Sequence, residues 1–370
     1  MDQLLTIPLD NLHREFNARM VPFAGYSMPV QYPEGIIKEH LHTRAQAGLF
    51  DVSHMGQVIV TGPDITATLE SLLPADLEAL PPHHSVYALL MNDEGGVRDD
   101  LIVTRWDGER FFMVINAACK HEDLDYLRAA APALEFSLVE DRALLALQGP
   151  AARAVVSRLL PEAAELVFMT GTECEFDGVP LYVTCSGYTG EDGFELSIPA
   201  ADAERVARAL LSEAEVAPVG LGARDSLRLE AGLCLYGHEL ATDITPVEAG
   251  LRWAIAAARR PDGVRPGGYP GADIVAQQMA DGPTRRRVGL KVLGKRPVRE
   301  GQSVFAADGQ VIGNVCSGAF GPSVEAPIAM AYVDPAYAAV DTELAVDVRG
   351  TSVTAQVVKM PLVPSRYHRG

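Results

Sequence analysis

The sequence predicts an α+β fold whose C-terminal part, 282–370, is an all-β barrel or sandwich. Before residue 257, segments with apolar residues at helical spacing alternate with β-rich segments. Proline, glycine and arginine then crowd together at 257–273, which marks a break in composition. Beyond this break, short strand-like segments are divided by turn signals, and this spacing is typical of a barrel or a sandwich.

The first half of the chain contains two predicted helices and two β-rich regions. Apolar residues recur at helical spacing in LDNLHREFNAR (9–19) and in IIKEHLHTRAQAG (36–48). The Pro/Gly-rich piece between them, 21–35, is predicted to be extended. QVIVTG (57–62) alternates like a strand. Residues 97–116 are predicted to form a hairpin, because the turn-like DGER joins two β-rich runs.

A second strand pair and two further helices follow. LYVTCS (181–186) and GFELSI (193–198) are β-rich and are predicted to pair with each other. ADAERVARALLSEAE (201–215) has apolar residues at helical spacing, and DSLRLEAGL (225–233) is also predicted to be helical.

Composition and charge exclude several classes of function. The 370 residues carry a formal net charge of −18, which argues against a general affinity for nucleic acid or for an anionic membrane surface. No uncharged apolar stretch of about 18 residues is present, so the sequence predicts no membrane span. The first residues also lack the apolar run of a signal peptide.

The cysteine and histidine patterns do not indicate a metal site. The chain has five cysteines, an odd number without a C-x-x-C pair, at positions 119, 174, 185, 234 and 316. This argues against a disulfide framework and a zinc site, and we interpret all five as structural or incidental. The histidines at positions 42, 54, 83 and 84 are interpreted as ordinary polar residues. We therefore expect no metal and predict a cytoplasmic protein, or one of the mitochondrial matrix for a mature organellar chain.

The stretch MNDEGGVRDDLIVT (91–104) places two adjacent aspartates between a glycine turn and an apolar strand. Because successive strand side chains alternate, Asp99 and Asp100 are expected to point to opposite faces, and only one can face a given pocket. Two interpretations stay open at this point: a solvated turn with two surface acids, or one acid that serves a site.

The stretch GYTGEDGFE (187–195) combines glycines with three carboxylates directly after a strand. No Lys-Ser/Thr follows its glycines, so it is not a P-loop. A carboxylate can instead bind a ligand that offers two adjacent N–H donors. Glu195 is expected to point opposite to Phe194, with Tyr188 nearby. The alternative is a hairpin whose acids face water.

The segment LGARDSLRLEAG (221–232) places Arg224 and Arg228 four residues apart on one helical face. Local ion pairs with Asp225 and Glu230 are one interpretation. The other is an arginine that orients the ligand-binding carboxylate or holds a ligand oxygen. The sequence contains no G-x-S-x-G, no H-E-x-x-H and no Rossmann G-x-G-x-x-G opening a βαβ unit.

Eight segments carry a resemblance to a known family. In chain order they are GLFDVSHMG (48–56), GGVRDDLIVT (95–104), VINAAC (114–119), LQGPAA (147–152), GYTGEDGFE (187–195), GARDSLRLEAG (222–232), DITPVEAGL (243–251) and RRRVGL (285–290). Each motif alone is weak, but eight in this order are specific. From about Pro22 to Tyr367, the chain resembles the aminomethyltransferase, or T-protein, family of the glycine cleavage system.

The resemblance implies a three-domain cloverleaf around a central channel that holds tetrahydrofolate. The first two domains are expected to be discontinuous α+β units. Residues 1–50 join 140–240 in the first, and 51–139 join 241–281 in the second. The third, 282–370, is the β-barrel or jelly-roll-like domain.

The resemblance also implies an activity. In the family reaction, an aminomethyl group is carried as a thioether adduct on the lipoyl arm of H-protein. Tetrahydrofolate accepts the carbon as 5,10-methylenetetrahydrofolate, and ammonia and the dihydrolipoyl arm leave. The expected partners are lipoylated H-protein and the co-substrate tetrahydrofolate; no flavin is expected. Two alternatives stay open: another tetrahydrofolate-dependent methyltransferase or demethylase of the superfamily, and a non-catalytic folate-binding relative.

The resemblance assigns roles to individual residues. Asp100 matches the catalytic aspartate of the family. The residues expected at the folate and substrate site are Tyr87, Asn116, Tyr188, Glu195, Arg224, Tyr367 and Met55. Glu195 is expected to bind the pterin ring, which shows N3–H and its 2-amino group side by side. Glu191 and Asp192 are expected to shape the turn. The tail carries Leu362 where the family usually has phenylalanine. This difference is expected to affect the packing of the tail more than the reaction.

Overall fold

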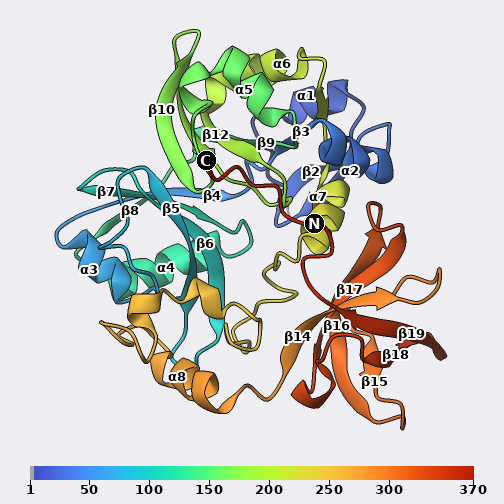
Figure 1. The fold of residues 1–370 in the computed structure, drawn as a ribbon. Coiled ribbons are helices and arrows are strands. Elements are labelled where there is room, and N and C mark those ends of the chain that lie inside the picture. Colours follow the sequence, from blue (N-terminus) through green and yellow to red (C-terminus); the bar gives the residue numbers. More distant parts are fainter. Residues whose placement is uncertain (1–3) are drawn as a thin grey trace.

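The computed structural model describes residues 4–370, which form three lobes (Figure 1). The α-helices of the described residues are α1 Asp10–Glu15, α2 Ile36–Ala45, α3 Ile65–Glu70, α4 Lys120–Ala130, α5 Ala152–Leu159, α6 Ala203–Leu211, α7 Leu221–Glu230 and α8 Ala272–Asp281. None of the helices within 4–370 is both long and apolar enough to cross a membrane.

The strands before the composition break are β1 Arg19–Phe23, β2 Tyr26–Gln31, β3 Ala47–Asp51, β4 Gly56–Thr61, β5 His84–Met91, β6 Val97–Arg105, β7 Arg110–Ile115, β8 Glu135–Leu138, β9 Arg142–Gln148, β10 Thr170–Phe176, β11 Val179–Cys185, β12 Gly193–Pro199 and β13 Val216–Pro218. Those after it are β14 Arg286–Val292, β15 Ser303–Phe305, β16 Val311–Gly321, β17 Ala326–Val333, β18 Glu343–Val348 and β19 Thr351–Val358.

An eleven-stranded sheet runs through two of the lobes. Its strand order is β13-β3-β9-β12-β11-β10-β5-β6-β7-β4-β8. A single residue pair, Thr170 with His84, joins β10 to β5 and so connects the two parts of the sheet. Strands β6 and β7 of one part line the same pocket as β9, β11 and β12 of the other. The faces of the two parts therefore turn toward each other, and a space for side chains lies between them.

Each part of the sheet has its own apolar core. Helices α1, α5 and α6 pack against β3, β9, β11 and β12, whereas α3 and α4 pack against the strands from β4 to β8. A third cluster joins β5 and β6 to the segment 229–255, to α8 and to the barrel strands β16 and β17. The interleaved domain boundaries given above stay a prediction.

Strands β14 to β19 close into a barrel with the order β14-β17-β16-β15-β18-β19. The closure pairs β14 with both β17 and β19, so the barrel has no free sheet edge. This confirms the predicted α+β fold with a C-terminal all-β barrel. The strand β15 has only three residues, which are too few for a periodic pattern in the sequence.

The predicted elements near the site are present. The hairpin expected over 97–116 is the antiparallel pair β6 and β7, and the second expected pair is β11 and β12. The hairpin of β1 and β2 begins at Arg19 and otherwise lies in the extended piece 21–35. Helices α1 and α2 lie inside their predicted ranges but are shorter, whereas α7 begins four residues before the range 225–233.

The C-terminal tail leaves the barrel and returns to the lobe that contains β9, β11 and β12 (the first lobe), where the chain ends close to β12 (Figure 1). The backbone N–H of Leu362 donates to the carbonyl of Glu230, and that of Arg366 donates to the carbonyl of Gly190. Leu362 also packs against the third apolar cluster. The tail therefore packs against the body of the protein although it carries leucine, and not phenylalanine, at this position.

Candidate active site

Asp99 and Asp100 point to opposite faces of β6, as the alternation of strand side chains requires. Asp99 is fully buried, whereas Asp100 lies on the face that Ile102 also occupies and is partly buried. The interpretation of this stretch as a solvated turn with two surface acids is wrong, because neither carboxylate lies in an exposed position.

Two neighbouring strands supply hydrogen-bond donors to Asp100. The hydroxyl of Tyr87 on β5 donates to Oδ2 at 3.0 Å. The side-chain amide of Asn116, directly after β7, donates to Oδ1 at 2.9 Å. The same amide nitrogen donates to Oδ1 of Asp99 at 2.8 Å, so one asparagine links both acids. The structure thus brings together three of the expected site residues.

The environment of Asp100 raises the pKa of its carboxyl group to about 7. Burial is the main cause, the charge of Asp99 adds to it, and the bonds from Tyr87 and Asn116 act in the opposite direction. The pKa of Tyr87 is raised well above its usual value, first by burial and then by Asp100. Tyr87 therefore stays a hydrogen-bond donor, and Asp100 can exchange a proton near neutral pH.

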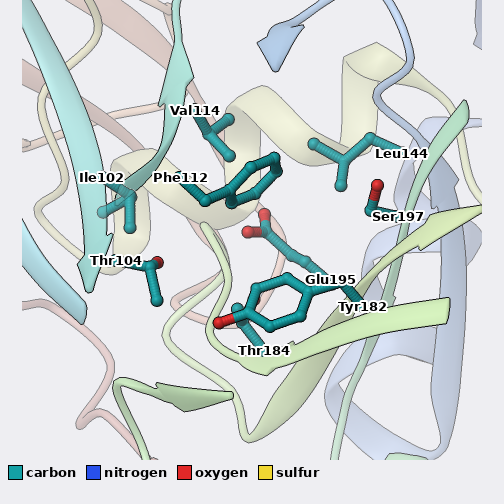
Figure 2. Close-up of a pocket in the computed structure, with 9 residues that line it drawn as sticks. All are labelled: Ile102, Thr104, Phe112, Val114, Leu144, Tyr182, Thr184, Glu195 and Ser197. Carbon is teal, nitrogen blue, oxygen red and sulfur yellow. The ribbon is translucent and has the colours of Figure 1, made fainter. Parts of the chain in front are cut away.

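Glu195 points from β12 into the pocket between the two parts of the sheet (Figure 2). Its neighbour Phe194 points the other way into the apolar core. The hydroxyl of Ser186 donates to Oε2 of Glu195 at 2.9 Å. Burial raises the pKa of Glu195, while Ser186 and the charge of Arg224 lower it. The pocket is lined by Ile102, Thr104, Phe112, Val114, Leu144, Tyr182, Thr184, Glu195 and Ser197.

Arg224 lies close to this carboxylate but forms no ion pair with it. The guanidinium carbon stands 4.6 Å from the ring centroid of Tyr188, a cation–π arrangement. No carboxylate within residues 4–370 comes within 4.0 Å of the guanidinium of Arg224. The hydroxyl of Tyr188 donates to the carbonyl of Cys234, which fixes the ring below the arginine. Glu195 and Arg224 therefore both have free capacity for a ligand.

Local ion pairing describes Arg228 but not Arg224. Arg228 is buried and pairs with Asp225 at 2.9 Å and with Glu239 at 2.7 Å. Glu230 turns to the other side of α7, where it contacts Arg44 and His40 at 3.1 Å. The two arginines of the motif thus differ in their surroundings: among residues 4–370, Arg228 has two carboxylate partners, whereas Arg224 has none.

The other two acids of the loop 187–193 hold its shape. Glu191 is buried and contacts Arg44 at 2.7 Å and Arg366 of the tail at 2.8 Å. Asp192 contacts Arg153 at 2.9 Å. The interpretation of this stretch as a hairpin whose acids face water is therefore wrong.

Two expected site residues have other contacts in the structure. Tyr367 lies beside the loop 187–193 but stacks on Phe168, with ring centroids 4.0 Å apart. Met55 packs with Val114, the residue two positions before Asn116, against an apolar cluster beneath α7. The described contacts link neither side chain directly to Asp100 or Glu195, and their roles stay predictions.

Two further residues lie beside the site, and neither was assigned a role there from the sequence. Trp253 stacks on Tyr87 at a centroid distance of 5.3 Å, and 60% of it is exposed. It is one of only two tryptophans in the sequence, and this rarity was the one feature of the sequence that could have indicated it. His54 is buried, and its pKa is lowered to about 3 by burial first and then by the charge of Arg224. It is therefore neutral, a state that no sequence pattern indicates.

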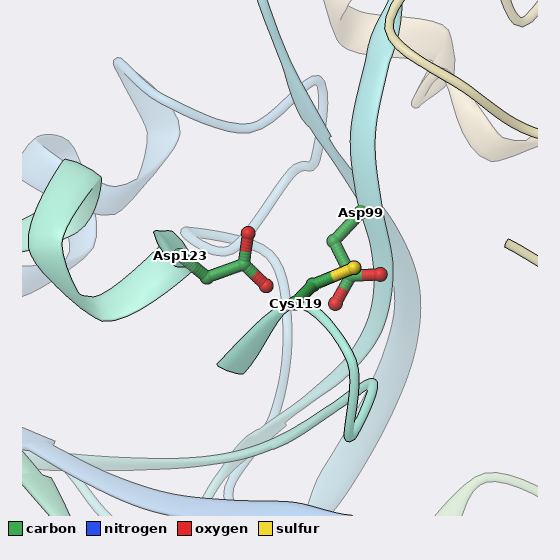
Figure 3. A group of neighbouring side chains, drawn as sticks. All are labelled: Asp99, Cys119 and Asp123. Carbon is green, nitrogen blue, oxygen red and sulfur yellow. The ribbon is translucent and has the colours of Figure 1, made fainter. Parts of the chain in front are cut away.

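One group of acid and thiol side chains in residues 4–370 is compact enough to be considered for an ion: Asp99, Cys119 and Asp123 (Figure 3). Asn116 already donates to both oxygens of Asp99, from its backbone at 3.0 Å and from its side chain at 2.8 Å. All five cysteines are free thiols. Because the oxygens of Asp99 already accept these hydrogen bonds, we interpret Asp99 and Asp123 as a hydrogen-bonded pair of acids and assign no metal to the group.

Comparisons with known proteins identify the family of the chain. The family described as "GCVT N-terminal domain" matches residues 9–259, and the family described as "Glycine cleavage T-protein C-terminal barrel domain" matches residues 285–364. A mitochondrial aminomethyltransferase of Dictyostelium discoideum is 42% identical over 100% of this chain and 94% of its own length. One of Gallus gallus is 44% identical over 98% of this chain and 93% of its own.

A solved structure has the same fold over nearly the whole chain. The crystal structure of glycine cleavage system aminomethyltransferase T from Bartonella henselae superposes with a TM-score of 0.93 at 43% identity. The match covers 99% of this chain and 100% of that one. With the family matches and the full-length relatives, this shows that the chain belongs to the glycine cleavage T-protein family of aminomethyltransferases.

Proposed function

We propose that this aminomethyltransferase moves the one-carbon unit from aminomethyl-lipoyl H-protein to tetrahydrofolate, with Asp100 as the catalytic residue. The observation that carries the proposal is the environment of Asp100. It is a partly buried carboxylate that is held by Tyr87 on β5 and by Asn116 directly after β7, and its pKa is about 7. Such a group is anionic in a large fraction of molecules at neutral pH and is fixed in position.

The chemistry needs an anion at this place. Positive charge develops on the one-carbon unit as ammonia or the lipoyl sulfur departs, and a preorganised carboxylate lowers the energy of that charge. Two carbon–nitrogen bonds form to the acceptor, and one carbon–nitrogen and one carbon–sulfur bond break. The two N–H hydrogens of the acceptor leave as protons, one to ammonia and one to the sulfur. Asp100 can relay either proton, while Tyr87 and Asn116 keep its oxygens oriented.

The pocket of Glu195 supports tetrahydrofolate as the acceptor. In the described residues only Ser186 donates to this carboxylate, so it can still accept two adjacent N–H donors from a pterin ring. Arg224 lies nearby, has no carboxylate partner among the residues described, and can hold a ligand oxygen. Tyr188, Met55 and Tyr367 complete the proposed folate and substrate site.

The proposed donor is the lipoylated arm of H-protein. Trp253 is the large exposed ring next to Tyr87, and it marks where a carrier arm can reach Asp100 from the surface. The relatives of Dictyostelium discoideum and Gallus gallus are named as mitochondrial enzymes. We propose that this chain acts in the cytoplasm, or in the mitochondrial matrix if it is a mature eukaryotic chain.

Turnover of loaded H-protein tests the proposal. Purified protein is mixed with aminomethyl-loaded H-protein, with and without tetrahydrofolate, and both ammonia and 5,10-methylenetetrahydrofolate are measured. We expect stoichiometric release of both products when folate is present. A methyltransferase or demethylase of the superfamily would act on another donor and leave loaded H-protein intact. A non-catalytic relative would bind folate and form neither product.

A further inference from the structure

A pair of buried acids lies behind Asp100, on the other face of β6. Asp99 comes from this strand, and Asp123 comes from the first turn of α4. Cys119 stands directly before that helix. The exposed fractions of the three residues are 0%, 3% and 7%, in this order, and their oxygen or sulfur atoms lie within 4.8 Å of one another (Figure 3). The proposed reaction does not use Asp123.

The hydrogen bonds around the pair are incomplete without a shared proton. Asn116 donates to both oxygens of Asp99. Oδ2 of Asp123 is buried and has no hydrogen-bond partner among residues 4–370. Two carboxylates this close and this buried cannot both be ionised, because the repulsion and the desolvation of two charges add up. A proton on Asp123 removes one charge and turns that group into a donor.

The asymmetry of the pair decides which acid carries the proton. The N–H donors around Asp99 stabilise its anion, whereas Asp123 has no comparable donors on its free oxygen. Burial, followed by the charge of Asp99, raises the pKa of Asp123 to about 9. Arg98 lowers this pKa, and the N-terminus of α4 also favours an anion, but neither outweighs the burial.

We propose that Asp123 is a positioning residue for the transfer reaction: it carries a proton that it shares with Asp99, and this bond keeps Asp99 in the anionic form that orients Asn116 toward Asp100. The proposal rests on the proposed function, since the end of this chain of contacts is the carboxylate that we expect to act on the one-carbon unit. The negative charge of Asp99 then has two effects. It fixes the amide of Asn116 that holds Asp100, and it raises the pKa of Asp100.

Other titratable or charged groups face this network from the surrounding elements. They are Tyr87 on β5, Arg98 on β6, Cys119 and Glu122 at the start of α4, Tyr188 in the loop 187–193, and Cys234 and Tyr236 after α7. Burial is the first cause that raises the pKa of Cys119, Tyr188 and Cys234, which therefore stay neutral around pH 7. Asp99, Asp100 and Asp123 thus determine the titration of the network near neutral pH.

Two substitutions at Asp123 separate the shared proton from packing. Asp123→Asn keeps the shape and a permanent N–H donor to Asp99, so we expect kcat with loaded H-protein within about threefold of wild type. Asp123→Val removes the donor, and Asp99 then takes up a proton or loses its hold on Asn116. We expect kcat to fall about tenfold or more, and the acid limb of the kcat–pH profile to move to lower pH, because Asp100 loses a neighbouring negative charge. Asp125, exposed on the same helix, gives the matched controls Asp125→Asn and Asp125→Val.

Infrared spectroscopy locates the proton without an activity assay. The difference spectrum between wild type and Asp123→Asn at pH 7 should show the C=O band of a protonated carboxyl group, and this band should shift in D2O. The Asp125→Asn difference spectrum should lack it. Absence of the band from the Asp123→Asn difference overturns the proposal.

The kinetics of the Asp123 variants give a second, independent test of the proposal. If Asp123→Val lowers only the melting temperature and leaves kcat and the acid limb unchanged, Asp123 merely packs and the proposal is wrong. If the Val variant does not fold, the Asn variant still decides: a large loss of kcat with an amide donor in place contradicts the proposal. Failure of the wild-type chain to release ammonia contradicts the proposed function instead, and the infrared band then decides on the proton alone.

Discussion

Tyr87 donates its hydroxyl hydrogen to Oδ2 of Asp100 at 3.0 Å, across two neighbouring antiparallel strands. In the register of β5 and β6, Tyr87 pairs with Ile102 and Leu89 pairs with Asp100. Tyrosine and aspartate are thus diagonal neighbours on one face, a separation that a long aromatic side chain can span. The relationship fixes one oxygen of Asp100, and Asn116 fixes the other.

Substitution of Asp100 tests the proposed catalytic residue directly. Asp100→Asn removes the negative charge but keeps the size of the side chain. We expect turnover of loaded H-protein at saturating folate to fall roughly 10²–10⁴-fold, the range for positioned acid–base or electrostatic groups. The melting temperature and folate affinity should change little. The control is Glu94→Gln, which changes an exposed acid in the turn between β5 and β6. Retained turnover in Asp100→Asn would remove this residue from the chemistry.

The pH dependence of turnover follows from the pKa of Asp100, which burial and then the charge of Asp99 raise to about 7. The proposed role needs the ionised form, so kcat should rise with pH through about 7 and level off above it. The stability of the folded protein depends on pH in the opposite direction. The folded state binds the proton more tightly than the unfolded state, so this contribution to stability is full below about pH 4 and is lost as pH rises through 7. Kinetic and thermal profiles of wild type and Asp100→Asn check both, and both transitions should be missing from the variant.

Glu195→Gln tests the proposed pterin contact. The amide oxygen still accepts one hydrogen bond, but the NH₂ group would face a donor of the ring. We expect the affinity for tetrahydrofolate to fall by about 1.5–3 kcal/mol, or roughly 10- to 150-fold. Stability at neutral pH should be kept or rise, because burial disfavours the charge of Glu195. Calorimetric titration measures the affinity, with Glu175→Gln, exposed on β10, as the control. Equal affinities of variant and wild type would exclude this contact.

The two arginines of α7 form a matched pair for one conservative change. Arg224→Lys loses the planar group over Tyr188 but breaks no ion pair, so we expect about tenfold weaker folate binding with little change in melting temperature. Arg228→Lys cannot keep the contacts to Asp225, Glu239 and Ser317 together. It should cost about 2–3 kcal/mol of stability, because buried partners lose their donors. The reverse pattern, with Arg224→Lys unstable and Arg228→Lys weak in binding, would contradict the assignment.

Glu230 joins the barrel and the tail to the first lobe. Its carboxylate accepts bonds from Arg44, His40 and the backbone of Ser323, and its carbonyl accepts two backbone bonds from the tail. Burial opposes ionisation, but the bonds from His40 and Ser323 prevail and lower the pKa to about 2. Its contribution to stability is therefore present above about pH 4.5 and is lost as pH falls toward 2. Glu230→Gln should cost about 3 kcal/mol or more at pH 7. Chemical denaturation at pH 7 and pH 4 measures this, and the difference from wild type should narrow at the lower pH.

Local periodicity by itself determined where several functional side chains point. The twofold repeat of a strand places Asp99 and Asp100 on opposite faces of β6, and it separates Glu195 from Phe194 on β12. Short β-rich segments with turn residues between them predicted the barrel, and the same signals predicted the hairpin of β6 and β7 and the pair of β11 and β12. These features depend on residues within a few positions of one another, so a single sequence is sufficient for them.

The tertiary structure alone decided which charges have partners. Glu191 is neutralised by Arg44 and Arg366, which are 147 and 175 positions away in the sequence. Within the described part of the chain, Arg224 has no carboxylate partner, although its neighbour Arg228 has two. No local pattern encodes these differences, because they depend on how the lobes and the tail pack. The pKa values follow the same rule, since desolvation sums over all atoms around a group, and only the folded chain brings Asp123 next to Asp99 behind the proposed catalytic carboxylate.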